Sequence, residues 1–398
     1  MNRPLVVIFA AIALDAIGIG LIFPILPRLI EEVTQARDVA SYLGVLTALY
    51  AAMQFAFAPV LGALSDRLGR RPVLLISLGG AALNYLLMAL APSLALLILG
   101  RAIAGLTSAN IAVATAYITD ISPEGTRAKR FGIFNAMFGI GFILGPVIGG
   151  VLGDYWLRLP FIAAAIPNAA NLLLALFVLP ESRRASASRI DLAALNPLRP
   201  LRWALSMRSL LPVIATFFVL SASGEVYGVC WALWGDDVFQ WNGLWIGLSL
   251  GTFGVCQSLA QAFLPGPAVR ALGERGAILT GIMAACLALA VLAFATQGWI
   301  VFVVMPVMAL AGIGTPALQS LATRLVDDDR QGQFQGVLAS AMSLASIFGP
   351  LLFSTVYFAV RERWPGAIWL SAMIVNAVAV PLVMGLRFRP RVNVGTER

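Results

Sequence analysis

The eleven residues from Gly62 to Pro72 read Gly-Ala-Leu-Ser-Asp-Arg-Leu-Gly-Arg-Arg-Pro, and they separate two long apolar runs. The runs extend from about Tyr42 to Leu61 and from Val73 to Leu90. Each is long enough to cross a bilayer as a helix, which takes about 20 residues at a rise of about 1.5 Å each. The stretch is therefore expected to be a very short turn between two membrane helices.

This turn carries glycines, a carboxylate and arginines in a specific order, at Gly62, Asp66, Arg67, Gly69, Arg70 and Arg71. Glycine allows helix ends to approach, a carboxylate accepts hydrogen bonds at a helix end, and arginines favour the cytoplasmic side. The order resembles the signature loop between the second and third helices of the major facilitator superfamily. That resemblance implies a cytoplasmic latch between two halves of a transporter; a simple topology anchor is the alternative.

Composition indicates a polytopic helical membrane protein, because 60% of the 398 residues are hydrophobic and only 12% are charged. Hydropathy predicts twelve spans, at about 5–27, 41–63, 73–91, 94–118, 131–153, 160–180, 210–232, 243–265, 276–296, 299–320, 334–358 and 365–386. Most of the 27 basic residues fall in alternate connecting segments, which predicts that both termini lie in the cytoplasm. The net charge of +8 is thus a topology signal and does not indicate a nucleic-acid partner.

Metal, disulfide and enzyme chemistry find little support. The chain has no histidine, and its three cysteines, Cys230, Cys256 and Cys286, fall in apolar spans. No combination of nucleophile, base and orienting group is visible. The N-terminal apolar run is interrupted by Asp15 and is followed by further spans, so it is interpreted as the first helix rather than as a signal peptide.

Three charged residues lie at membrane depth, where such groups are costly and usually functional. Asp15 lies in the first span, which is expected to end at Pro24 and Pro27. We predict that it pairs with Arg101 and that the pair couples proton movement to transport, the alternative for Asp15 being a structural role. Glu225 is a second proton or cation site candidate, with a gate residue as the equally weighted alternative.

Neutral polar residues complete the expected cavity. Gln54, Asn84 and Gln257 interrupt apolar spans and are predicted to bind substrate, a hydrogen bond between helices being the equally weighted alternative for Gln54. Asp120, at the end of the fourth span, is assigned to the inner gate. Four tryptophans, Trp231, Trp234, Trp241 and Trp245, surround the turn after the seventh span. An aromatic belt at the membrane interface is the simplest explanation for them.

The fifth span contains closely spaced glycines around a proline, at Gly141, Gly145, Pro146, Gly149 and Gly150. Small residues four apart allow tight helix contact, and proline kinks a helix. The pattern is similar to the motif of drug/proton antiporters, where it is thought to seal the cavity against leak. A dinucleotide-binding fingerprint is excluded because no strand–helix–strand unit surrounds it.

A polar, arginine-rich stretch divides the chain into residues 1–180, a cytoplasmic linker at 181–208, and residues 209–398. The two long parts show a faint repeat at an offset of 204 residues, in which Gly69 corresponds to Gly273 and Asp66 to Arg270. Two parallel six-helix repeats, with a substrate site between them, are the expected all-α architecture.

Nearly the whole chain resembles the tetracycline/proton antiporters of Gram-negative bacteria. The closest strings are Leu14–Leu21 and Gly44–Gln54, and the resemblance continues into the second half at Gly312–Gln319. The resemblance implies functional roles for Asp15, Gln54, Asp66, Arg70, Arg101 and Asp120. Three positions depart from the family: Asn84 replaces an acidic residue, Gln257 a histidine and Ala285 an aspartate. In the family, those positions are implicated in binding the metal–tetracycline chelate and in proton coupling. We therefore expect the fold to be kept and tetracycline not to be a substrate.

We therefore expect a proton-driven exporter of small amphipathic compounds, tetracycline-like or other drugs, located in the bacterial inner membrane as the resemblance implies. It would work as a monomer by alternating access, with the proton gradient as its energy source and without a cofactor. A carrier of an anionic metabolite, bound by Asp15 and Arg101, is the second hypothesis, and a non-transporting receptor on a transporter fold is the third.

Overall fold

The computed structural model describes residues 3–35, 38–108, 110–182, 196–198, 202, 210–323, 326 and 331–385. Within these ranges, 12 helical segments are long and apolar enough to span a membrane, in agreement with the hydropathy prediction. Most of the predicted linker, residues 183–195, 199–201 and 203–208, lies outside the described residues.

The helices follow the chain in this order: α1 (Arg3–Thr34), α2 (Val39–Leu68), α3 (Arg70–Leu90), α4 (Leu94–Thr107), α5 (Asn110–Ile121), α6 (Glu124–Tyr155), α7 (Leu159–Val178), α9 (Leu211–Phe239), α10 (Gly243–Phe263), α11 (Pro265–Ala293), α12 (Gly298–Leu310), η1 (Ala311–Ile313), α13 (Gly314–Thr323), α14 (Gln331–Val360), α15 (Ala367–Ala377) and α16 (Ala379–Met384). Three spans are built from successive segments, namely α4 with α5, α12 with η1 and α13, and α15 with α16.

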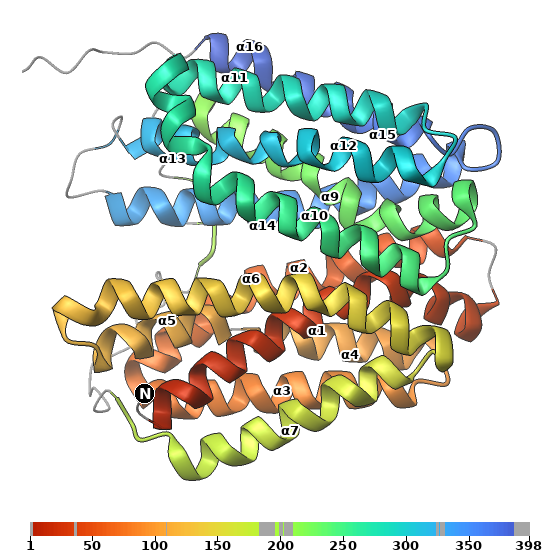
Figure 1. Ribbon diagram of the computed structural model, residues 1–398. Coiled ribbons are helices and arrows are strands. Elements are labelled where there is room, and N and C mark those ends of the chain that lie inside the picture. Colours follow the sequence, from red (N-terminus) through yellow and green to blue (C-terminus); the bar gives the residue numbers. More distant parts are fainter. Residues whose placement is uncertain are drawn as a thin grey trace, which may run out of the picture.

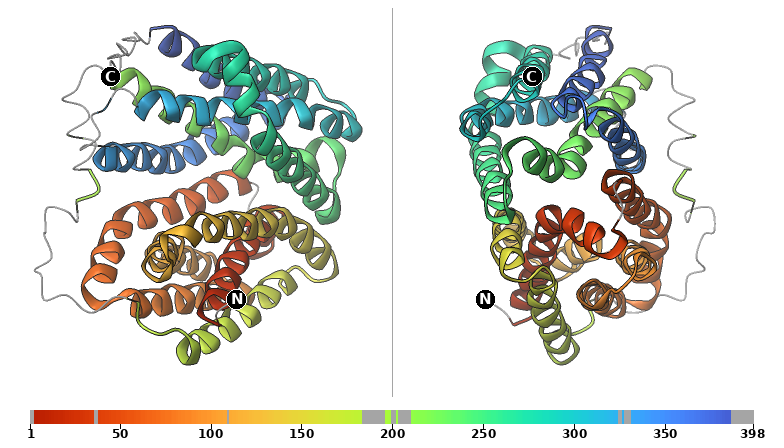
Figure 2. Two further views of the ribbon diagram at one scale, coloured as in Figure 1. Left: turned by 60° about the vertical axis from the view of Figure 1, so that its left-hand side comes forward. Right: turned by 90° about the vertical axis from the view of Figure 1, so that its right-hand side faces the viewer.

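The helices form two bundles (Figure 1). Helices α1 to α7 pack together in the first bundle, and α9 to α16 pack together in the second. Both views in Figure 2 show the bundles facing each other, with the N-terminus in the first. The two bundles are the structural units between which a cavity can form.

Contacts between the bundles are closest toward one end, which we call the Asp154 end, at the right in Figure 1. There α6 packs against α10 and α2 against α14. A Cβ atom at Gly247 would overlap the backbone of Pro146, and one at Gly44 would overlap Ser354. Glycine thus permits the bundles to touch through their backbones.

The opposite end, which we call the Asp66 end, is packed differently. A Cβ atom at Gly62 in α2 would meet no described residue within 4 Å, and the same holds for Gly266 in α11. Gly62 therefore does not mediate a close helix approach here, contrary to expectation. The structure represents a state in which the bundles are closed against each other at the Asp154 end.

Two local predictions need correction. Helix α1 does not end at Pro24 and Pro27 but continues through both to Thr34, because helices in an apolar environment tolerate proline when neighbouring groups compensate. The turn expected over Gly62–Pro72 is reduced to Gly69, whose φ of 104° favours glycine over residues with a side chain. Its repeat counterpart Gly273 also has a positive φ, of 71°.

The tryptophan prediction is also partly wrong. Trp231, Trp234 and Trp241 are buried in the second bundle, where the rings of the first two lie 5.6 and 5.1 Å from that of Trp369. Trp245 is exposed, as an interface residue would be. Helix rotation, which the spacing of the tryptophans does not fix, turns the first two rings inward.

Candidate functional site

A cavity of about 420 Å³ lies between the bundles, with walls from α1, α2, α3, α4 and α6 on one side and from α9, α10 and α14 on the other. Its wall is mostly apolar. Its polar side chains belong to Asp15, Thr47, Tyr50, Gln54, Ser77, Asn84, Tyr85, Arg101, Thr107, Ser108, Glu225, Tyr227 and Ser346. The structure thus places Asp15, Gln54, Asn84, Arg101 and Glu225 around one cavity.

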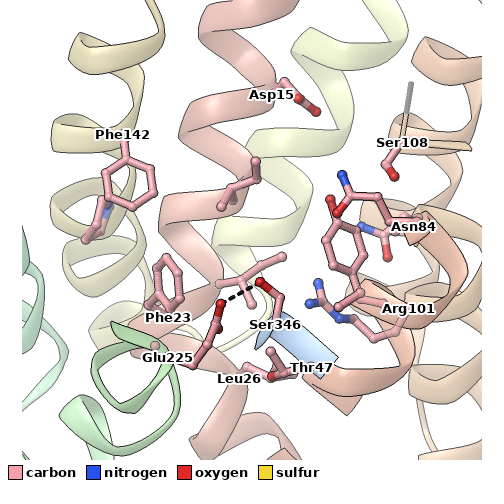
Figure 3. Close-up of a pocket in the computed structure, with 18 of the residues that line it drawn as sticks. Asp15, Phe23, Leu26, Thr47, Asn84, Arg101, Ser108, Phe142, Glu225 and Ser346 are labelled. Atoms are coloured by element: carbon pink, nitrogen blue, oxygen red, sulfur yellow. Dashed lines mark hydrogen bonds between the residues drawn. The ribbon is translucent and has the colours of Figure 1, made fainter. Parts of the chain in front are cut away.

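Arg101 does not face Asp15 as expected. Its guanidinium lies over the ring of Tyr50, 4.6 Å from the ring centroid, and its Nε atom is buried without a hydrogen-bond partner among the described residues. Figure 3 shows the Asp15 carboxylate and the Arg101 guanidinium at separate places on the wall. A cation over an aromatic face is favourable, which explains how Arg101 is accommodated away from Asp15.

Glu225 belongs to the second bundle and projects into the cavity from α9. Its carboxylate accepts a hydrogen bond of 2.6 Å from the hydroxyl of Ser346 in α14 (Figure 3). The stem of Glu225 packs against Gly349, where a Cβ atom would lie 2.8 Å from it. Glycine at this position therefore makes room for the carboxylate beside α14.

The predicted substrate residues divide between two cavities. Gln54 and Asn84 line the central one, and Asn84 is buried with its Oδ1 atom unpartnered among the described residues. Gln257 lines an adjoining cavity of about 240 Å³ in the second bundle, together with Ala285. The cavities share a wall made of Gly224, Tyr227 and Phe253, so Gln257 lies behind the central cavity.

The second cavity has neutral walls. Its polar side chains are those of Ser223, Tyr227, Gln257, Thr315 and Asn376, and none of its lining residues in the described part of the chain is acidic or basic. Gln257 Oε1 is buried there without a hydrogen-bond partner among the described residues.

The stretch around Gly69 is held together by a network at the Asp66 end. The buried Arg70 guanidinium contacts Asp66 at 2.8 Å, Asp120 at 3.1 Å and the Ser65 hydroxyl at 3.0 Å. Arg67 on the same turn is exposed. The network joins α2, α3 and α5, all within the first bundle, and it connects the predicted gate residues Asp66, Arg70 and Asp120.

Glu181 is a member of this network that the sequence analysis missed. Its carboxylate accepts hydrogen bonds from the backbone N–H groups of Arg70, at 2.7 Å, and Arg71, at 3.2 Å. It thereby caps the first turn of α3, where unpaired N–H groups favour an anion. The Arg71 side chain donates to the Leu176 carbonyl at 2.6 Å, which ties the same turn to α7. The available signal was an acidic residue directly after the sixth span.

A second missed residue, Asp154, joins the bundles at the other end. Its carboxylate accepts hydrogen bonds from Arg28 of the first bundle, at 2.7 Å, and from the backbone N–H groups of Gly243, at 3.0 Å, and Leu244, at 2.9 Å. Those N–H groups begin α10 of the second bundle. We call this arrangement the Asp154 clasp.

The glycines of the fifth predicted span serve contact between helices. Cβ atoms at Gly141, Gly145 and Gly149 would approach α1, and one at Gly150 would overlap the backbone of Gly243 in α10. Pro146 lines the central cavity between these contacts. The motif therefore lets α6 lie tightly against α1 and, across the bundle interface, against α10.

Comparison with known proteins agrees with this architecture. The family model of the Major Facilitator Superfamily matches residues 8–235 and 213–398. The chain is 47% identical to the class C tetracycline resistance protein of Escherichia coli, over 96% of each chain, and 42% identical to the class G protein of Vibrio anguillarum, over 96% of this chain and 98% of the relative. The solved structure of the nucleoside transporter NupG has the same fold, with a TM-score of 0.81 and 15% identity over 98% of this chain and 100% of that one.

The two-bundle helical fold, the central cavity and these matches lead to one classification. The chain is a multi-pass membrane transporter of the Major Facilitator Superfamily, and it belongs with the tetracycline resistance proteins within that family.

Proposed function

We propose that this transporter exports small amphipathic compounds across the bacterial inner membrane in exchange for protons, by alternating access. The observation that carries the proposal is a cavity between two bundles, with the carboxylate of Asp15 on one side and that of Glu225 on the other. A carboxylate in a cavity between two bundles meets different neighbours and a different amount of water when the bundles rock against each other.

The proposed orientation places the Asp66 end in the cytoplasm, in keeping with its arginines. The described state, closed at the Asp154 end, is then the inward-facing one, which receives substrate from the cytoplasm. Rocking of the bundles breaks the Asp154 clasp and brings the Asp66 end of α2 toward the second bundle. The space beside Gly62 supports this movement, because no residue that the structure describes lies within 4 Å of a Cβ atom built there.

Proton coupling is assigned to Asp15 and Glu225, with Arg101 as a fixed positive charge in the cavity. Protons and substrate can shift the balance between the two states only through different affinities for them. Asp15 lies on α1, which packs along α6, and α6 in turn contacts the second bundle. Protonation of Asp15 would therefore change the charge on a helix that packs against α6, one of the two helices that meet at the Asp154 end.

We infer the substrate class from the relatives named as tetracycline resistance proteins, and then adjust it for three residues of this chain. Asn84, Gln257 and Ala285 leave the predicted chelate-binding positions neutral. We propose that other amphipathic compounds are exported in preference to tetracycline.

A susceptibility panel in an efflux-deficient bacterial host tests this function. It compares the wild type with Asp15→Asn across tetracycline, other antibiotics and cationic dyes. Asp38→Asn is a matched control, because Asp38 caps α2 outside the cavity and asparagine can retain that cap. We expect resistance to at least one compound in the wild type and the control and its loss in Asp15→Asn. Normal expression without resistance to any compound would contradict the proposal.

Transport of an anionic metabolite is a second candidate, favoured by the Nε atom of Arg101, which lies in the cavity wall without a hydrogen-bond partner among the described residues. Such transport would differ from proton-driven export in its energy source. Uptake of an organic anion that persists after collapse of the proton gradient would support it over proton-driven export.

A further inference from the structure

The charges that line the central cavity do not balance. Among the described residues, its acidic and basic lining residues are Asp15, Glu225 and Arg101, two carboxylates and one guanidinium. With all three ionised, the lining carries one net negative charge. A cavity of this kind favours a ligand with one positive charge, because opposite charges attract strongly where water is largely excluded.

Glu225 is the carboxylate best placed to meet such a ligand. Its hydrogen-bond partner is the neutral hydroxyl of Ser346, and no ion pair to it is found among the described residues. Arg101 lies on the opposite side of the cavity in Figure 3, over the ring of Tyr50. A buried carboxylate without a cationic partner is costly, so a bound cation would stabilise it.

Aromatic rings line the same cavity as this carboxylate. Phe23 contacts Phe142 edge to face, with 6.1 Å between ring centroids, and Tyr227 stacks on Phe253 at 6.2 Å. All four rings line the cavity, and Phe23 lies beside Glu225 in Figure 3. Aromatic faces attract cations and bury the apolar part of a ligand, so the rings and the carboxylate suit the same ligand chemistry.

We propose that Glu225 and these rings form a subsite for lipophilic aromatic cations, in which the Glu225 carboxylate holds the positive charge. The subsite rests on the proposed function, since it names the substrate class of the same cavity. Arg101 on the opposite wall repels a second positive charge and orients a cation toward α9. Since Gln257 and Ala285 are neutral, Glu225 is, among the residues that the structure describes, the acidic one that the second bundle contributes to either cavity.

Binding to the purified full-length protein in detergent tests this subsite. The probes are tetraphenylphosphonium, the neutral triphenylphosphine oxide and the anion tetraphenylborate, which have similar aromatic bodies and differ in charge. Glu225→Gln removes the charge but keeps an oxygen that can accept from Ser346. Ser346→Ala removes the hydrogen bond but keeps the charge, and Asp38→Asn is a carboxylate change outside the cavity.

We expect the wild type to bind tetraphenylphosphonium more tightly than the other two probes. Glu225→Gln should weaken tetraphenylphosphonium binding by about tenfold and leave triphenylphosphine oxide binding unchanged. Ser346→Ala and Asp38→Asn should keep the preference for the cation. Retained binding of the neutral probe also shows that each variant is folded.

The proposal is overturned if the wild type shows no preference for the cation. It is also overturned if Glu225→Gln weakens the binding of tetraphenylphosphonium and of triphenylphosphine oxide equally, as a structural role would require. These measurements need no proton gradient, so they are independent of the transport assay. Proton-driven export without a cation preference would refute the subsite alone, and cation binding without any proton-driven transport would refute the proposed function alone.

Discussion

The Asp154 clasp should decide how strongly the protein favours the described state. Two of the three hydrogen bonds that Asp154 accepts come from the start of α10, and these two join the bundles. The third comes from Arg28 and stays within the first bundle. Asp154→Ala removes the acceptor and therefore should release the Asp154 end.

The size of the effect can be worked from this geometry. A hydrogen bond to a charged group contributes roughly 1.5–3 kcal/mol when well shielded. The Asp154 side chain is 24% exposed, and water can replace it at the freed N–H groups, so we assign about 1 kcal/mol to each bond across the bundles. The sum of about 2 kcal/mol corresponds to a change of about thirtyfold in the ratio of the two states.

Distances between spin labels measure that ratio. Labels at Leu90→Cys in α3 and Trp299→Cys in α12 lie on exposed positions at the Asp154 end of different bundles, in a background with the three native cysteines replaced. Asp154→Ala should increase the population with a long distance. Glu32→Gln is the control, because it breaks an ion pair with Arg158 within the first bundle, 2.9 Å long. Identical distance distributions for the wild type and Asp154→Ala would refute the reasoning.

Two further substitutions test local parts of the structure. Gly69→Ala should destabilise the protein by roughly 1–2 kcal/mol, because φ is positive at Gly69 and the new Cβ atom would overlap Glu181. The loss should appear as a lower thermal unfolding temperature in detergent, whereas Gly62→Ala should leave that temperature unchanged. Equal effects of the two substitutions would contradict the distinction. The double substitution Gln257→His and Ala285→Asp places titrating groups in the second cavity. It should raise tetracycline resistance several-fold in a growth assay. An unchanged or lower resistance would show that these two positions do not limit the substrate range.

Hydropathy is sufficient to predict the helices, because a bilayer imposes length and apolar composition on every span. Glycine patterns also carry information: the repeat that relates Gly69 to Gly273 corresponds to two positive φ angles in the structure. The exact helix ends are less accessible. Neither Pro24 nor Pro27 ends α1, since surrounding helices stabilise it beyond both.

Side-chain partners across helices were harder to predict. The expected pairing of Asp15 with Arg101 depends on how α1 and α4 are rotated about their axes, and the structure places Arg101 on Tyr50 instead. Gln257 is separated from the central cavity by the side chains of Tyr227 and Phe253, a relation that no local spacing encodes.

The missed residues have a common cause. Asp154 and Glu181 act by accepting hydrogen bonds from backbone N–H groups at the starts of distant helices, 89 and 111 positions away in the sequence for Gly243 and Arg70. Sequence patterns show a carboxylate near a helix end but do not show which other helix begins beside it.

The central claim is that a titrating carboxylate on α1 couples proton movement to export. The most direct measurement is proton release from energised everted vesicles, followed with a pH-sensitive fluorescent dye, on addition of the compound that the wild type exports best. We expect prompt proton movement with the wild type and with Asp38→Asn, and none above background with Asp15→Asn at equal expression. Wild-type proton movement in Asp15→Asn would contradict the account.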